Sequence, residues 1–327
     1  MRRFVGVALL AAAVVSCSSG SSGGPSTTTQ PTVALMAGFN PGPAPDPSVG
    51  FQFITPIVTN IEPGASDEYC TYTNIITTQE LWVDSNQGFQ TETGHHIVLY
   101  YATTPQPPET HLCATEEMAE FQFGMGAGGG PGASKFVLPG NLAVHIPAGA
   151  QLVINHHYLN ASATPVAEAQ SAIDVYYADP TVPHTPSSMM VVVDTNLTVP
   201  VGASKYTEDC TVNQTYTAWS QFPHMHNWGT HVTITDTPIA TGVAQQLFDM
   251  DWQADYAFDF SSVATTEPVG TPFVYNKGDK IHIECDYMNT TGSPMTFGAE
   301  MCVFANFTED PNNIGNMACD GGQWGPI

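Results

Sequence analysis

The sequence predicts an all-β fold made of two tandem antiparallel β-sandwich domains of jelly-roll type. Glycine and proline are abundant, with 29 and 26 of the 327 residues. They separate short runs rich in Val, Ile, Thr, Tyr and Phe, which is the pattern of short strands joined by turns. No long stretch has the i, i+3, i+4, i+7 apolar spacing of an amphipathic helix. Many short strands in one chain are typical of stacked antiparallel sheets.

Eight segments show the strand pattern most clearly: 80–84, 96–101, 151–155, 172–177, 189–194, 231–235, 280–287 and 300–307. A Gly-rich run at 126–132 is predicted to be a mobile loop. It lacks the following Lys-Ser/Thr and the helix of a phosphate-binding loop. Three prolines between Asp179 and Pro186 predict a break between two domains, at 33–182 and 183–327.

The N-terminus has the features of an export signal. Two arginines precede a short apolar run that ends at Val15, too short to span a membrane. Ser16-Cys17 ends a motif that resembles a bacterial lipobox, which predicts a signal peptide at 1–17 and lipidation of Cys17; the alternative is an ordinary secretory signal. Ser18 is typical of lipoproteins sent to the outer membrane. Residues 18–32 are a flexible Ser/Gly/Thr linker. We therefore expect an exported protein, lipid-anchored to the bacterial cell envelope at the outer membrane.

Cysteine usage fits that compartment. If Cys17 carries lipid, six of the seven cysteines remain, and three disulfides with fifteen possible pairings are expected. None of the six lies in a CxxC pair, which argues against a zinc ribbon or a thioredoxin motif.

The charge balance excludes nucleic acid as a partner. The formal net charge is −24, and after signal cleavage only four lysines oppose the 30 acidic residues. Such a chain repels nucleic acid and anionic lipid, and the charge serves solubility rather than a cationic substrate. We expect a monomer.

The second half carries a pair of histidines at i, i+2. His224 and His226 point to the same side if they lie on a strand, and there they can chelate one metal ion. Met301 would add a thioether, a soft ligand that favours copper over zinc, calcium or magnesium. The alternative is two core or surface histidines and a core methionine.

The first half carries adjacent histidines. His95 and His96 would point to opposite faces of a regular strand, so they can share a metal ion only at a bulge or strand end, for which Gly94 is suited. His156 or His157 would supply a third ligand. Three imidazoles suit an electron-relay copper and equally suit zinc. The alternative is a histidine pair in a polar strand.

Together these motifs resemble the copper type II, ascorbate-dependent monooxygenases, the family of peptidylglycine α-hydroxylating monooxygenase and dopamine β-hydroxylase. The likeness extends from about Phe51 to Cys319. It rests on the order and spacing of Glu68-Tyr69-Cys70, the His-His pair, His157-Tyr158, the His-x-His pair, Gly278-Asp279 ahead of Cys285, and Glu300-Met301-Cys302.

The resemblance implies two coppers per chain. An electron-storing copper would bind His95, His96 and His157, the last preferred to His156 because it precedes a tyrosine. An O2-activating, catalytic copper would bind His224, His226 and Met301. The resemblance also implies the disulfides Cys70–Cys113, Cys210–Cys319 and Cys285–Cys302.

The implied reaction is hydroxylation of a C–H bond of a small organic substrate by O2. Ascorbate or another one-electron donor would be the co-substrate. The peptide-processing enzyme binds its substrate's carboxylate through an Arg, an Asn and a Tyr, whose positions here hold Phe222, Val303 and Ala305. A peptidylglycine substrate is therefore not expected, and Phe222, Phe304 and Trp228 indicate either an apolar substrate or sandwich core. Two alternative hypotheses are a non-catalytic copper-binding lipoprotein for storage, delivery or sensing, and an adhesive or structural β-sandwich protein.

Overall fold

The computed structural model describes residues 33–114, 117, 120–128, 132–160, 162–257, 262–267 and 270–327. Cys17, the predicted signal peptide at 1–17 and the linker at 18–32 lie outside these residues. The regular structure is almost entirely strand, and the prediction of an all-β fold with tandem antiparallel sandwiches of jelly-roll type is confirmed. Among the described residues, no helix has the length and apolarity needed to cross a bilayer.

The described residues of the first half form twelve strands. They are β1 (Gly50–Ile54), β2 (Val58–Ile61), β3 (Ser66–Ile76), β4 (Leu81–Gln90), β5 (Gly94–Ala102), β6 (Glu109–Leu112), β7 (Gln122–Gly128), β8 (Gly132–Val137), β9 (Leu142–Ile146), β10 (Gln151–Leu159), β11 (Val166–Ala169) and β12 (Ser171–Tyr177).

In the second half, thirteen strands and one short 3₁₀ helix lie within the described residues. They are β13 (Thr185–Val193), β14 (Thr198–Val199), β15 (Gly202–Thr211), β16 (Tyr216–His224), β17 (Gly229–Thr237), β18 (Gln245–Asp251), η1 (Ala254–Ala257), β19 (Thr265–Thr266), β20 (Phe273–Tyr275), β21 (Lys280–Asn289), β22 (Met295–Thr296), β23 (Val303–Glu309), β24 (Met317–Asp320) and β25 (Gln323–Pro326).

The same strand arrangement occurs in both halves. In the first, β12 pairs with β1 and β4, β10 with β3 and β5, and β11 with β2. In the second, β23 pairs with β13 and β16, β21 with β15 and β17, and β22 with β14. The turns also correspond: Asn160 directly follows β10 and Asn289 is the last residue of β21, and the Oδ1 of each accepts a backbone N–H and a hydroxyl from the residue two positions on.

Strand patterning explains the sheet faces. β17 alternates buried and less buried residues, as expected for a strand with one face on the core. β10, the middle strand of its sheet, is buried along eight of its nine residues. That strand carries His156 and His157, which point to opposite faces of the sheet, and both side chains lie inside the protein.

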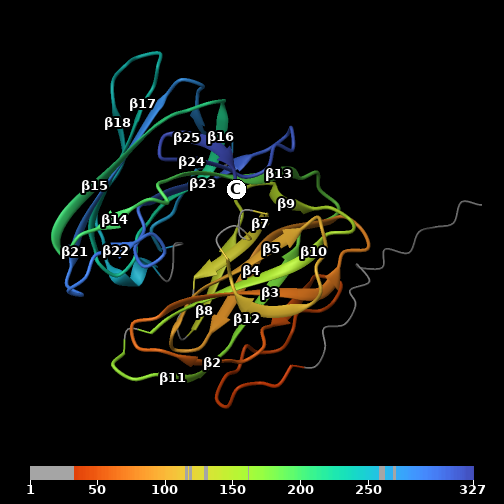
Figure 1. Ribbon diagram of the computed structural model, residues 1–327. Coiled ribbons are helices and arrows are strands. Elements are labelled where there is room, and N and C mark those ends of the chain that lie inside the picture. The colour runs from red at the N-terminus through yellow and green to blue at the C-terminus, as the bar shows by residue number, and fades with distance from the viewer. Residues whose placement is uncertain are drawn as a thin grey trace, which may run out of the picture.

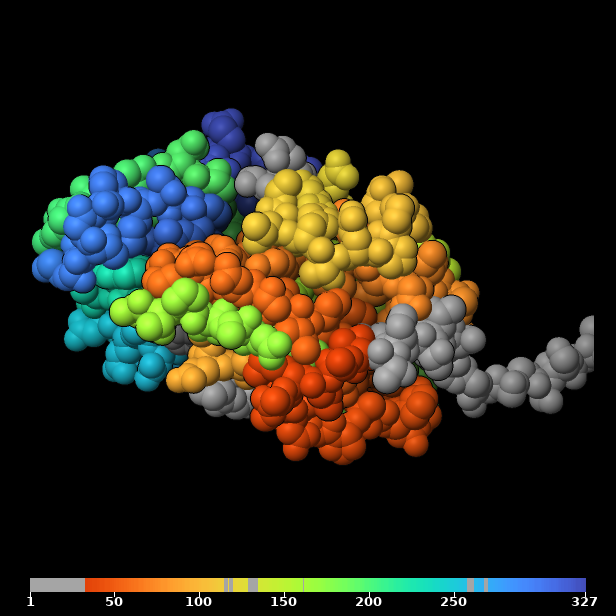
Figure 2. Space-filling view, turned by 60° about the horizontal axis from the view of Figure 1, so that its bottom comes forward, coloured from red at the N-terminus to blue at the C-terminus, as the bar shows by residue number. Residues whose placement is uncertain are grey.

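The two halves lie side by side (Figures 1 and 2) and pack against each other. The parallel pairing of β9 with β13, Leu142 opposite Thr185, joins sheets from both halves. One hydrophobic core runs through both, and Phe136 of β8 stacks on Phe307 of β23 with ring centres 4.8 Å apart.

Each of the eight predicted segments overlaps a strand, but two details differ. Residues 300–302 precede β23, because Glu300 and Met301 take part in a turn contact instead. The Gly-rich segment is not a loop at its start: residues 126–128 belong to β7, pair with β5 and are buried. Residues 129–131 of the predicted loop lie outside the described residues.

Three disulfides join Cys70 to Cys113, Cys210 to Cys319, and Cys285 to Cys302. These are the pairs that the family resemblance implies. Cys210–Cys319 connects β15 to β24, and Cys285–Cys302 connects β21 to the residue after Met301.

Candidate metal centre

Five histidine side chains converge where the two halves meet. His95, His96 and His157 form one group whose ligand atoms lie within 4.8 Å of one another, and His95, His224 and His226 form a second such group. The sequence predicted one site in each half. The structure brings the imidazoles of both into one cluster.

A bulge in β5 lets adjacent histidines face the same cluster. His96 is opposite His157, but Gly94 is opposite Tyr158, so the register skips His95. The predicted irregularity at Gly94 is therefore present. A side chain could not replace its hydrogen, since a Cβ there would lie 2.2 Å from the Cβ of Gln90.

His157, and not His156, belongs to the cluster. Neighbouring strand residues point to opposite faces, and both ring nitrogens of His156 are hydrogen-bonded elsewhere, Nε2 to the Thr71 hydroxyl and Nδ1 to the Tyr158 hydroxyl. His157 has its Nε2 at 2.8 Å from Ser66 Oγ. The structure thus separates the two candidates that the sequence left open.

His224 and His226 do come together, but the strand argument for them was wrong. His224 is the last residue of β16, and His226 lies in the segment before β17. Their ring centres are 5.1 Å apart. Contacts specific to the segment, and not strand periodicity, bring the two rings together.

Three contacts hold His226. Its backbone N–H donates to the Glu300 carboxylate, its Nδ1–H donates to the Ala299 carbonyl at 3.2 Å, and its own carbonyl accepts from the Trp252 indole at 2.9 Å. Glu300 also accepts the backbone N–H of Trp228. The Ala299 contact fixes the tautomer, because a carbonyl can only accept, and Nε2 carries the lone pair.

Met301 is fixed next to this segment through its backbone. Its N–H donates to Glu300 Oε1 at 2.9 Å, and its carbonyl accepts from the Tyr287 hydroxyl at 2.9 Å. Glu300 thus bonds to the backbones of both His226 and Met301. Ligation by the Met301 thioether stays a prediction from the resemblance.

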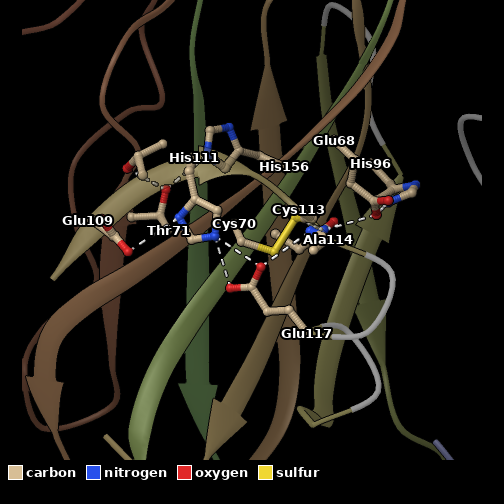
Figure 3. The surroundings of a disulfide bond; sticks show 12 residues. Glu68, Cys70, Thr71, His96, Glu109, His111, Cys113, Ala114, Glu117 and His156 are labelled. Carbon is tan, nitrogen blue, oxygen red and sulfur yellow. Dashed lines mark hydrogen bonds and ion pairs between the residues drawn. A yellow bond between two sulfur atoms is a disulfide. The ribbon is translucent and has the colours of Figure 1, made fainter. Parts of the chain in front are cut away.

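Glu68 supports the three-histidine group. Its Oε1 lies 3.6 Å from His96 Nε2 and accepts the Asn155 amide at 2.9 Å. Its backbone carbonyl accepts the N–H of Cys113, so the Cys70–Cys113 disulfide lies next to this contact (Figure 3). Burial alone would raise the pKa of Glu68. The hydrogen bond and the charge of His96, together with the hydrogen bond from the Asn155 amide, lower it to about 2.

Burial keeps four of the clustered imidazoles, those of His95, His157, His224 and His226, neutral. It lowers the pKa of His157 to about 3, with the charge of His96 adding to the effect. It lowers the pKa of His226 to about 4, against the hydrogen bond to Ala299. Burial and the other imidazoles hold the pKa of His95 and of His224 well below the usual value. Neutral imidazoles are the form that binds metals.

The donor set fits a transition metal. Two ring nitrogens, His157 Nδ1 and His226 Nε2, are buried and make no hydrogen bond within the described part of the chain. A buried acceptor without a partner costs about 1–3 kcal/mol, and a metal ion removes that cost. Imidazole ligands suit copper and zinc, and they do not suit calcium or magnesium.

The sequence motifs indicated no role for the residues that orient the ligands. Glu68 and Glu300 both lie in segments that carry the family resemblance, so proximity to the Cys and Met motifs could have marked them. The hydroxyl of Ser66, the indole of Trp252 and the carbonyls of Ala257 and Ala299 have no sequence signal of this kind.

No protein-family model matches this chain, and no curated protein matches it in sequence. Among solved structures it is similar to a peptide-N(4)-(N-acetyl-β-D-glucosaminyl) asparagine amidase, with 12% identity and a TM-score of 0.37 over 82% of this chain and 98% of that chain. PNGase F from Flavobacterium meningosepticum has 12% identity and a TM-score of 0.33 over 80% of this chain and 96% of that chain. The major capsid protein P2 from bacteriophage PM2 has 9% identity and a TM-score of 0.31 over 81% of this chain and 100% of that chain. Likenesses this weak carry no argument about function.

Proposed function

We propose that this protein is a copper-dependent monooxygenase that hydroxylates a C–H bond of a small organic substrate, using O2 and a one-electron reductant such as ascorbate. The observation that carries the proposal is the convergence of five imidazoles, with a buried nitrogen lacking a hydrogen bond in each half. The resemblance of the His and Met motifs to the ascorbate-dependent copper enzymes supplies the reaction class.

The residues of the chain hold and orient the metal ions. His96 and His157 would bind one copper, His224, His226 and Met301 the other, with His95 next to both groups. Bound copper supplies the one-electron chemistry with O2 that none of these side chains can perform. Glu68 and Glu300 orient ligands, and His95 and His226, each 0% exposed, are shielded from water.

The substrate should lack a carboxylate anchor. Phe222 and Ala305, which replace carboxylate-binding residues of the peptide enzyme, are buried and lie opposite each other in the sheet. Phe304 is fully buried too, which favours a core role over substrate contact. Both arginines of the chain lie in the predicted signal peptide. A neutral or apolar small molecule fits these residues better than an acid.

Export and lipid anchoring at Cys17 complete the proposal. Three disulfides within one chain are typical of an oxidising compartment outside the cytoplasm. O2 and diffusible reductants are available to a surface-anchored enzyme there.

Copper content and O2 uptake test the proposal together. Reconstituted, desalted protein should carry copper by elemental analysis and consume O2 only with ascorbate and substrate present. His226→Ala should abolish O2 consumption, whereas His231→Ala should leave it unchanged, because His231 pairs with Asp249 and Asp251 outside the cluster. Tight copper binding without ascorbate-dependent O2 uptake across a panel of small apolar compounds would instead favour a storage, delivery or sensing protein. Absence of copper binding would contradict both.

A further inference from the structure

His95 belongs to both groups of converging imidazoles. Its ring centre lies 4.6 Å from that of His226 and 5.9 Å from that of His224. The rings of its own half, His96 and His157, are each at 4.9 Å. The nearest imidazole to His95 therefore comes from the second half of the chain.

The second half also orients the His95 ring. Its Nε2–H donates to the carbonyl oxygen of Ala257, in η1, at 3.2 Å. His95 is 0% exposed, and the bulge after Gly94 turns it out of the regular alternation of β5. A residue of the first half is thus fixed by a backbone group of the second.

This contact limits what His95 can bind. A neutral imidazole that donates from Nε2 presents one lone pair, at Nδ1. His95 can therefore complete the group of His96 and His157 or the group of His224 and His226, but not both at once.

We infer that His95 is a metal ligand of the second-half site, completing a three-imidazole site with His224 and His226 that both halves build together. The inference rests on the proposed copper function and refines it. A metal ion at this site links the two halves directly. His96 and His157 then remain as a two-imidazole site, so the chain binds two copper ions with unequal affinity.

The test removes the other group first. In a His96→Ala/His157→Ala background, one equivalent of Cu(II) should bind to His95, His224 and His226, and pulsed EPR should count three imidazole nitrogens. Adding His95→Ala should leave two nitrogens and weaken Cu(II) binding, measured by competition with a chelator, by about tenfold or more. Adding His231→Ala in its place should change neither quantity.

Unchanged Cu(II) affinity and nitrogen count on adding His95→Ala would overturn the inference. Failure of the His96→Ala/His157→Ala variant to bind Cu(II), while the unmutated chain binds it, would also overturn the inference. His95, His224 and His226 would then be present without forming a site. Failure of the unmutated chain to bind copper would instead overturn the proposed function. Near-UV circular dichroism checks folding, and a parallel His→Gln series replaces any alanine variant that does not fold.

Discussion

At the scale of single residues, each oriented imidazole depends on a partner that the sequence does not reveal. His226 Nδ1–H donates to the Ala299 carbonyl, His95 Nε2–H donates to the Ala257 carbonyl, and His157 Nε2 bonds to Ser66 Oγ. The residue types and their spacing singled out the same five histidines, although as two separate sites, one in each half. Every residue has a carbonyl, however, so nothing in the sequence marks the two that select the tautomers.

Glu68 should tune the site of His96 and His157 through charge. Glu68→Gln keeps the acceptor for the Asn155 amide but removes the negative charge 3.6 Å from His96 Nε2. We expect about tenfold weaker Cu(II) binding and a higher Cu(II)/Cu(I) potential, because the carboxylate favours the more highly charged ion. Chelator competition and redox titration measure these changes.

Glu117→Gln is the matched control for this prediction. Glu117 bonds to Nε2 of His111, close to the same disulfide but outside the cluster (Figure 3). An equal loss of Cu(II) affinity in both variants would mean that general surface charge, and not the contact with His96, is responsible.

A buried carboxyl pair away from the cluster should destabilise the fold at neutral pH. Burial and the neighbouring Asp279 raise the pKa of Asp236 to about 6, and its Oδ1 makes no hydrogen bond among the described residues. The folded state therefore binds the proton more tightly than the unfolded state. The resulting destabilisation is fully present above about pH 6 and disappears as the pH falls toward 3.8.

Asp236→Asn should accordingly raise the free energy of unfolding by about 1–2 kcal/mol at pH 7, after discounting the pKa shift for solvent screening. The gain should shrink toward zero near pH 4. Urea denaturation at both pH values measures it, with the exposed Glu168→Gln as control, expected within about 0.5 kcal/mol of the unmutated chain. A gain that does not depend on pH would refute the ionisation argument.

At the scale of elements, local irregularity determines where the ligands lie. The sequence predicted the irregularity at Gly94, because adjacent histidines can share an ion only where a strand is bulged. It misjudged His224 and His226, which lie at and beyond the end of β16. Periodicity could not reveal this, since the segment is held by Glu300 from a distant part of the chain.

Gly94→Ala should disturb the bulge. The added Cβ would lie 2.2 Å from Gln90 Cβ, so β5 or β4 must shift. We expect a loss of about 1–3 kcal/mol in the free energy of unfolding and weaker Cu(II) binding, because the bulge positions both His95 and His96. Gly325→Ala is the control, because a Cβ there meets no atom within 4 Å. Unfolding curves and Cu(II) competition report the two effects, and identical behaviour of both variants would exclude a special requirement for glycine.

At the scale of the whole molecule, the repeated strand arrangement of the two halves explains why the sequence predicted the fold class well. Short strands and turn residues occur in both halves, and the sandwich follows from them. The contact between the halves could not be predicted, because it depends on long-range pairs such as β9 with β13 and Phe136 with Phe307. For the same reason the sequence placed one metal site in each half, whereas the packed halves share a cluster.

Because one hydrophobic core runs through both halves, the metal-free chain should unfold in a single cooperative transition. Calorimetry should give equal calorimetric and van't Hoff enthalpies. Phe136→Ala removes an aromatic contact between the halves and should lower the free energy of unfolding by roughly 3–5 kcal/mol while splitting the transition in two.

Phe248→Ala is the matched control. Phe248 is as buried as Phe136, at 7% against 6% exposure, but it packs on Phe304 within the second half. It should destabilise the protein by a similar amount with one transition retained. Two resolved transitions in the unmutated chain would show that the halves unfold independently. In that case the shared position of His95 would need a bound metal ion to persist, and adding Cu(II) should merge the two transitions into one.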